Sequence, residues 1–87
     1  MRFEFDPVKS AANWVKHGID FLEAQRIWDD SERLEISARS SDEPRYQVIG
    51  RIGRNTWSAF IIYRNETIRI ISVRRARREE EARYRAF

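Results

Sequence analysis

Four arginines lie where one residue pattern gives way to another: Arg74, Arg75, Arg77 and Arg78. Residues 68–73 before them alternate and are rich in β-branched types, which predicts a strand, whereas residues 76–86 are mostly strong helix formers. Cations in the first helical turn oppose the helix macrodipole, at a cost of about 1 kcal/mol. A function would offset that cost, and a helix N-terminus beside guanidinium groups is suited to hold an anion such as phosphate.

The charge of the chain is divided unevenly along its length. Residues 1–44 carry six Lys/Arg and ten Asp/Glu, whereas residues 45–87 carry eleven Arg and four Glu, so the net charges are −4 and +7. Only Lys9 and Lys16 are lysines. Because arginine binds phosphate through two N–H groups and stacks on bases, this bias favours a nucleic-acid or phosphate partner, and arginine-rich codon usage is the alternative explanation.

A second group of polar residues lies near the N-terminus: Lys9, Asn13, Lys16 and His17. Their spacing of four, three and one places them on one face of a helix. Such a face could contact RNA or titrate near neutral pH through His17. The alternative is a solvated face with His17 at the helix C-terminus.

The elements that position these residues follow from caps and periodicity. Residues 2–5 predict a short strand, and Asp6-Pro7 and Gly18 delimit a helix over residues 7–17. The apolar residues of that helix predict a buried stripe made of Val8, Ala11, Ala12, Val15 and then Ile19. Asp20 and Glu23 predict a capping box for a second helix over residues 21–29, which has no assigned chemistry.

From Arg33 onward the pattern is that of strands joined by short connections, which implies an antiparallel meander. A polar loop covers residues 40–44, and the nearly continuous apolar run Trp57–Tyr63 predicts a central strand covered on both faces. The last helix has a thin apolar face that includes Tyr84 and Phe87. Two helices, a meander and a final helix predict an α+β fold in a single domain over residues 1–87.

Composition excludes several classes of function. The chain has no cysteine and one histidine, so we expect neither disulfides, nor thiolate chemistry, nor a dedicated metal site, and no cofactor. The lack of cysteine fits a reducing cytoplasm. We expect no membrane partner, because no apolar run approaches the length of a membrane span and no signal peptide precedes Phe3.

Three blocks of residues resemble the BrnT toxin family, across nearly the whole chain. The first contains Phe3-Glu4-Phe5-Asp6, Lys9, Asn13, Lys16-His17-Gly18, Phe21 and Ala24, and the second contains Glu43, Arg45 and Gly50. The third contains Ile68-Arg69-Ile70-Ile71-Ser72, Arg74, Ala76, Arg78, Glu80 and Tyr84. The chain departs from the family at Val73, Arg75 and Arg77, where Ala, Lys and Thr are common. If the family uses the position of Arg75 as a proton donor, arginine cannot serve there, because it does not release its proton.

The resemblance implies a RelE-like fold, with a curved antiparallel sheet, two N-terminal helices and one C-terminal helix. It implies an endoribonuclease that inhibits translation as the toxin of a type II toxin–antitoxin system. The implied partners are RNA, a cognate ribbon-helix-helix antitoxin, and operator DNA only through the antitoxin complex.

RNA cleavage without a metal needs a base for the 2′-hydroxyl, an acid for the leaving 5′-oxygen and cations for the phosphorane charge. We hypothesise that Arg74 and Arg69 clamp the scissile phosphate, with His17 or Glu80 as general base and Lys16 or Tyr84 orienting or protonating. Further basic residues would bind the RNA backbone: Lys9, Arg45, Arg51, Arg75 and Arg78.

Each assignment has a structural alternative. Strict alternation along the strand places Arg69 on the side opposite Arg74, where it could serve as a structural ion-pair partner. Glu80 and Tyr84 are spaced by four residues, and their alternative role is to attach the last helix to the rest of the fold without taking part in the chemistry. For the whole chain the alternative is a non-catalytic module, such as a decayed toxin, that binds nucleic acid or an antitoxin.

Overall fold

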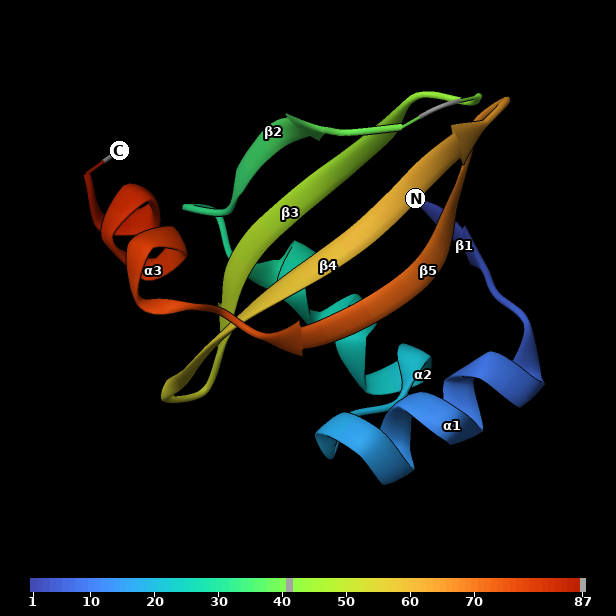
Figure 1. Cartoon of the computed structure of the whole chain (residues 1–87), viewed down its shortest axis with the longest axis horizontal. Helices are drawn as coiled ribbons and strands as arrows, with labels where there is room; N and C mark the ends of the chain where they lie inside the picture. The colour runs from blue at the N-terminus through green and yellow to red at the C-terminus, as the bar shows by residue number, and fades with distance from the viewer. Residues whose placement is uncertain (41, 87) are drawn as a thin grey trace.

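The computed structural model describes residues 1–40 and 42–86, which form a five-stranded sheet with helices packed on it (Figure 1). The strands are β1 (Arg2–Glu4), β2 (Leu34–Ala38), β3 (Arg45–Ile52), β4 (Asn55–Arg64) and β5 (Thr67–Arg75). The helical elements are α1 (Pro7–His17), α2 (Phe21–Ala24), the 3₁₀ helix η1 (Gln25–Asp29) and α3 (Arg78–Arg85). The predicted α+β class is confirmed. Ser41 of the expected polar loop and Phe87 of the expected last-helix face lie outside the described residues.

The sheet has the strand order β1-β5-β4-β3-β2, with β4 in the centre as predicted. Strands β2 to β5 pair antiparallel, which confirms the meander. The expectation of a fully antiparallel sheet is wrong at one edge, because β1 pairs parallel to β5. The chain leaves β1 through the helices and returns to the same edge only after the whole meander, so β5 runs in the direction of β1.

Beyond the short strand β1, a side chain forms the hydrogen bonds of the backbone groups at the edge of β5. Pairing with β1 ends at Glu4 and Arg69. Farther along β5, Asn13 Nδ2 donates to the Val73 carbonyl at 2.9 Å and Asn13 Oδ1 accepts from the Val73 amide at 3.2 Å. Asn13 Nδ2 also donates to the Ile19 carbonyl at 2.8 Å. The buried Asn13 amide therefore takes the place of a strand at this edge and fixes α1 beside β5.

The predicted orientation of α1 is wrong, although its bounds, its Asp6 cap and its Gly18 end are confirmed. The expected buried stripe of Val8, Ala11, Ala12 and Val15 is exposed, whereas Ser10 and Asn13 are buried. Ser10 Oγ accepts from the Phe21 amide at 2.9 Å. Ser10 and Asn13 point inward because they bind backbone groups at the start of α2 and at the edge of β5. Asn13 is thus not part of a solvated face with Lys9, Lys16 and His17.

The core lies between the sheet and the segment that contains α2 and η1. Phe21, Ala24 and Ile27 from this segment pack against strand residues, which include Val48, Trp57, Ala59, Ile61, Ile70 and Val73. The expected single helix over residues 21–29 continues as 3₁₀ from Gln25. A Cβ added at Gly50 would lie 2.8 Å from Ile27 Cγ2, so glycine allows η1 to approach β3 closely.

A β-bulge in β5 changes which arginines share a face. Phe60 pairs with Ser72 but Ile61 pairs with Ile70, so Ile71 is the extra residue. Arg69 lies opposite Ile62 and Arg74 lies opposite Ser58, and both partners point to one face of β4. We call this face, which carries Ser58, Phe60, Ile62 and their cross-strand partners, the open face. The expectation from strict alternation, that Arg69 and Arg74 lie on opposite sides, is wrong because of the bulge.

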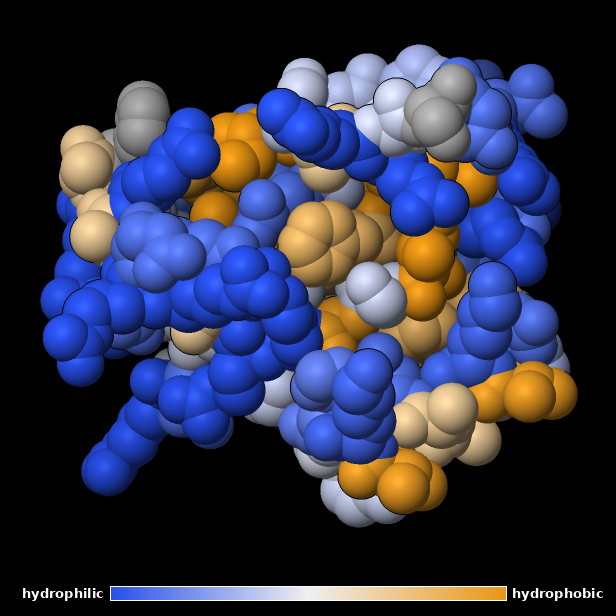
Figure 2. All heavy atoms as spheres, in the orientation of Figure 1, coloured by the Kyte–Doolittle hydropathy of each residue, from blue (hydrophilic) through white to orange (hydrophobic). Residues whose placement is uncertain are grey.

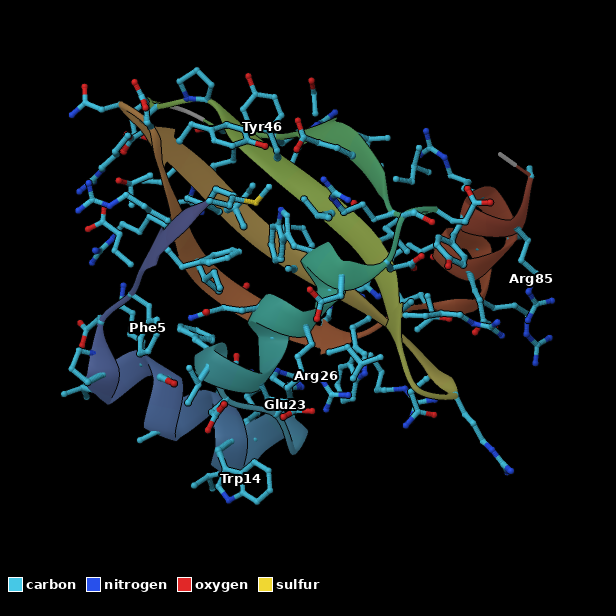
Figure 3. The ribbon with its side chains drawn as sticks, turned by 180° about the vertical axis from the view of Figure 1, so that it is seen from behind. Phe5, Trp14, Glu23, Arg26, Tyr46 and Arg85 are labelled. Atoms are coloured by element: carbon cyan, nitrogen blue, oxygen red, sulfur yellow. The ribbon has the colours of Figure 1, made fainter. Side chains whose placement is uncertain are left out.

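Helix α3 covers one end of the open face, while α2 and η1 cover the other side of the sheet (Figures 1 and 3). It begins at Arg78, two residues later than the expected start at Ala76. Its Tyr84 hydroxyl donates to Asp30 Oδ2 at 2.6 Å, which joins α3 to the segment between η1 and β2. None of the helices within the described residues has the length and apolar character that crossing a membrane requires.

Candidate active site

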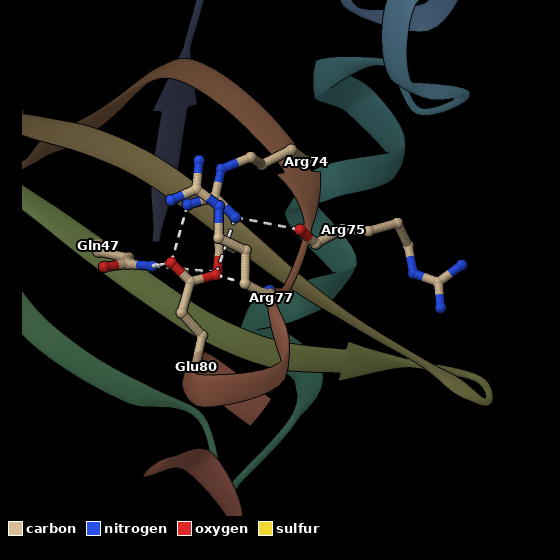
Figure 4. A network of polar contacts seen from close by, with 6 residues as sticks. Gln47, Arg74, Arg75, Arg77 and Glu80 are labelled. Carbon is tan, nitrogen blue, oxygen red and sulfur yellow. Dashed lines mark hydrogen bonds and ion pairs between the residues drawn. The ribbon is translucent and has the colours of Figure 1, made fainter. Parts of the chain in front are cut away.

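The carboxylate of Glu80 is bound at the junction between β5 and α3 (Figure 4). Arg74 Nη1 donates to Glu80 Oε1 and Arg74 Nη2 donates to Glu80 Oε2, each at 2.8 Å. The backbone N–H of Arg77, which precedes α3, donates to Glu80 Oε1 at 2.8 Å. The structure therefore places an anion between guanidinium and a helix N-terminus, and that anion is a side chain of the same protein.

Two buried polar side chains on the open face complete the binding of Glu80. Gln47 Nε2 donates to Glu80 Oε2 at 2.8 Å and to Ser58 Oγ at 3.1 Å. The Ser58 hydroxyl donates to Glu80 Oε1 at 3.0 Å. Sequence reasoning did not select Gln47 or Ser58. The only feature of the sequence that could have indicated them is that each is a polar residue among largely apolar residues of a predicted strand.

These contacts change the pKa values of both charged partners. The hydrogen bonds from Arg74, then those from Arg77, Gln47 and Ser58, outweigh burial and lower the pKa of Glu80 from 4.5 to about 2. The hydrogen bonds to Glu80 raise the pKa of Arg74 above its ordinary value. Glu80 is therefore an anion and a weak base at neutral pH.

Arg74 keeps one pair of N–H groups available while it binds Glu80. Its Nη1 donates to Glu80 and to the Arg75 carbonyl, and one hydrogen of Nη2 is directed at Glu80. Within the described residues the Nε–H and the second Nη2–H receive no acceptor, and these two groups form the side edge of the guanidinium. The guanidinium lies over the Phe60 ring, 5.3 Å from its centroid, and 21% of the Arg74 side chain is exposed. The geometry suits a second bidentate contact, to a phosphate.

The other arginines proposed from the sequence are distributed over both faces. Arg69 lies on the open face and pairs with Glu4 of β1 at 3.1 Å. Arg45 and Arg51 are exposed and share the parity of Gln47 in β3, which places them on the open face as well. Arg75 lies opposite Trp57 on the other face, 5.5 Å from the centroid of its ring, and Arg78 is exposed at the start of α3. Figure 2 shows the open face, where hydrophilic side chains surround hydrophobic ones.

Tyr84 lies in the same helix as Glu80 but belongs to a different network. Asp30 Oδ2 accepts from the Tyr84 hydroxyl and from the Arg51 amide at 2.8 Å, while Asp30 Oδ1 accepts from the Glu32 amide at 2.9 Å. Burial and the bond to Asp30 raise the pKa of Tyr84 to about 12. Asp30 had no assigned role in the sequence, and the structure gives it the role of anchoring α3.

The remaining predicted residues lie on α1, away from the Glu80 network. Lys9 and Lys16 are exposed and His17 is half-buried at the end of the helix. In the described part of the chain, no hydrogen bond or ion pair joins these three side chains to Arg74 or Glu80. The same ranges contain no group of three or more His, Cys, Asp or Glu residues that could hold a metal ion.

Comparison with known families identifies one family model that matches this chain. The family model for BrnT, described as the ribonuclease toxin of type II toxin–antitoxin systems, matches residues 5–80. The match includes Lys16, His17, Arg69, Arg74 and Glu80, and it ends before Tyr84. A search of curated proteins found no match. Because the match spans most of the chain, the protein belongs to the BrnT family of ribonuclease toxins of type II toxin–antitoxin systems.

Proposed function

We propose that the chain is a metal-independent endoribonuclease of RelE-like fold, which inhibits translation by cleaving RNA at the open face. The observation that carries the proposal is the Arg74–Glu80 pair. Glu80 fixes the guanidinium from one side, and Arg74 shares the open face of the sheet with Arg69, Arg45 and Arg51. A preorganised cation of this kind stabilises charge that develops in a transition state.

The proposed reaction is an attack of the RNA 2′-oxygen on the adjacent phosphorus. The new 2′-O–P bond forms as the 5′-O–P bond breaks, which gives a 2′,3′-cyclic phosphate and a 5′-hydroxyl end. A base takes the proton of the 2′-hydroxyl, and an acid gives a proton to the leaving 5′-oxygen. Arg74 holds two non-bridging oxygens through Nε–H and Nη2–H while the negative charge on the phosphorane increases.

The contacts favour some of the sequence hypotheses for the base and the acid over others. Glu80, with a pKa of about 2 and its oxygens occupied, is suited to position Arg74 rather than to accept a proton. Tyr84, with a pKa of about 12 and its proton directed at Asp30, is a weak acid that anchors α3. By elimination His17 remains as the candidate for general base and the neighbouring Lys16 as the candidate for proton donor. Both lie on α1, outside the Glu80 network, so this assignment requires the RNA to extend from Arg74 to the end of α1.

The RNA backbone would follow the arginines of the open face and its rim. Arg45, Arg51 and Arg69 extend from Arg74 across β3 and β5, and Arg78 stands at the start of α3. Arg75 and Lys9 would contact the backbone only beyond the edge of the sheet. As a type II toxin the chain would be neutralised in the cytoplasm by a protein antitoxin of the ribbon-helix-helix class, and their complex would bind operator DNA through the antitoxin.

The test replaces Arg74 and compares growth and RNA cleavage after induction in a bacterial host without an antitoxin. We expect wild type to arrest growth and cleave RNA, and Arg74→Ala to lower the cleavage rate about 10²–10³-fold. Arg74→Lys should recover little of the cleavage rate, because an ammonium group cannot make one bidentate contact to Glu80 and a second to phosphate. Arg85→Ala, which removes an exposed arginine of α3, should leave cleavage unchanged.

Loss of Arg74 leaves Glu80 without its cation, so the double variant Arg74→Ala/Glu80→Gln serves as the folded reference, checked by circular dichroism. His17→Gln separates binding from catalysis, because it should abolish cleavage and keep RNA affinity. Folded wild-type protein that binds RNA without cleaving it would contradict the proposal and indicate the non-catalytic module.

A further inference from the structure

Helix α1 presents apolar residues to solvent along its whole length. We call Val8, Ala11, Ala12 and Val15 the α1 stripe. Val8 is 75% exposed and Val15 is 85% exposed, and both alanines are exposed between them. The opposite side of the helix is occupied by Ser10 and Asn13 with their buried hydrogen bonds, so rotation of α1 cannot bury the stripe.

The α1 stripe continues into a pocket beside the helix. Trp14 is 59% exposed and Leu22 is 66% exposed, and both line a pocket of about 480 Å³ whose other apolar residues are Ile19, Ile52 and Trp57. Figure 3 shows Trp14 projecting from α1 away from the sheet, with Glu23 and Arg26 nearby. Four of the six large hydrophobic residues that are exposed in the described ranges therefore lie on this side of the molecule, which marks an interaction surface.

The other border of the stripe is positively charged. On the helical projection Lys9 and Lys16 flank the stripe on the side opposite Trp14. They are the only lysines of the chain, and the ion pairs of the described residues include neither of them. A partner that covers the stripe would bring acidic side chains to these two ammonium groups, because opposite charges at a rim steer and orient association.

We propose that the α1 stripe and its pocket form the docking site for an amphipathic, acidic helix of the cognate antitoxin. Ala11 and Ala12 are small, so a second helix can approach α1 closely between Val8 and Val15. An apolar anchor of that helix would fill the pocket beside Trp14, in the manner of helix-in-groove recognition. The proposal rests on the proposed function for the identity of the partner, and on the stripe for its location and chemistry.

The charge of the border argues against a second copy of this chain. A symmetric antiparallel pairing of two α1 stripes would place the lysines of both copies on the same side of the contact. Repulsion between these like charges would weaken such a dimer, whereas the same two lysines would attract the carboxylates of an acidic partner. The stripe is also unsuited to RNA, which binds through arginines and stacked aromatic side chains.

The experiment measures binding of the protein encoded beside this gene to the chain in an Arg74→Ala background, which prevents toxicity during expression. We expect Val8→Glu/Val15→Glu to weaken the affinity at least 100-fold, measured by titration calorimetry. We expect Lys9→Glu/Lys16→Glu to weaken it about tenfold and to reduce its dependence on salt. All four residues are exposed, so circular dichroism and thermal melting should match those of the parent chain.

The matched control for Lys9→Glu/Lys16→Glu is Arg2→Glu/Arg39→Glu, which makes the same charge change at exposed residues outside the stripe. It should alter the affinity less than twofold. Unchanged affinity in Val8→Glu/Val15→Glu would overturn the docking site while leaving the antitoxin partnership intact. A dimer of the chain alone that is lost in this variant, seen by sedimentation, would assign the stripe to a second copy and also overturn it. If the parent chain does not bind the neighbouring protein, the partner is wrong, whether or not wild type cleaves RNA.

Discussion

At the scale of single residues, Glu80 connects three strands to the last helix. Its two oxygens accept five hydrogen bonds, from Arg74, Gln47, Ser58 and the Arg77 amide. Only 13% of its side chain is exposed, so solvent screens these bonds weakly. Protonation of Glu80 would weaken nearly all of them together, because a neutral carboxyl group is a poorer acceptor.

The lowered pKa of Glu80 predicts a pH dependence of stability. A carboxyl group whose pKa falls from 4.5 to about 2 on folding stabilises the protein above pH 4.5 and loses this contribution as the pH falls toward 2. The contribution amounts to at most about 3 kcal/mol. Glu80→Gln should lower the free energy of unfolding at pH 7 and flatten its decline between pH 4.5 and pH 2, measured by urea denaturation.

The reference for this prediction is Glu66→Gln, at an exposed residue in the turn between β4 and β5. In this variant the free energy of unfolding should decline between pH 4.5 and pH 2 as it does in the wild type. A decline that persists unchanged in Glu80→Gln would assign the acid sensitivity to other carboxyl groups.

At the scale of elements, α3 is held at both of its ends by side chains rather than by an extensive apolar face. Glu80 binds the sheet near its start, and the Tyr84 hydroxyl binds Asp30 near its end. Tyr84 is the buried residue of this helix. We therefore expect α3 to open more readily than the strands beneath it.

Tyr84→Phe tests this attachment. The substitution keeps the ring and removes the hydroxyl, while Asp30 keeps its bonds from the amides of Arg51 and Glu32, so we expect a loss of about 1 kcal/mol. Amide hydrogen exchange should accelerate in α3 and stay unchanged in β4. Cleavage activity should fall less than tenfold, whereas a loss of 10²-fold or more in the folded variant would assign Tyr84 to the chemistry.

The sequence predicted the existence and bounds of most elements better than their orientation. Caps and periodicity are local signals, so Asp6, Gly18 and the strand alternation located α1 and the meander correctly. The orientation of α1 depends on distant backbone groups at Val73 and Phe21, which periodicity cannot reveal. The hydrophobic pattern of α1 fits burial against a partner as well as burial in its own core.

The site was partly predictable for a similar reason. Arg74 was selected because arginines at the start of a helix oppose its dipole, and Glu80 because it belongs to the block that resembles the BrnT family. Gln47 and Ser58 join them only through the pairing of β3, β4 and β5, which no single segment encodes. The position of Arg69 depended on a bulge at Ile71, and one extra residue reverses the alternation that placed it.

At the scale of the whole molecule, the two surfaces have opposite chemistry. The open face carries arginines from the second half of the chain, whose net charge is +7. The first half, with a net charge of −4, supplies α1, α2 and η1, where the exposed stripe is apolar. The uneven division of charge along the sequence is therefore also a division in space between an arginine-rich face and an apolar stripe.

This division predicts which arginines set the salt dependence of RNA binding. On a cleavage-resistant 2′-O-methyl RNA, Arg45→Gln and Arg51→Gln should each lower the slope of log affinity against log salt by about 0.7. Arg26→Gln, on the helix side of the sheet, should leave the slope unchanged. Equal effects of all three substitutions in a fluorescence anisotropy titration would argue against an RNA path along the open face.

The parallel pairing of β1 with β5 bears on the order in which the protein can mature during synthesis. Residues 2–4 leave the ribosome more than sixty residues before their partners at 67–69. The same late strand carries Arg74 and the Val73 backbone that Asn13 binds. An unfinished chain thus lacks the closing strand, the support of its first helix and the central residue of its site, all at once. A fragment released by a ribosome that stalls before β5 therefore contains neither Arg74 nor the backbone that holds α1 in place.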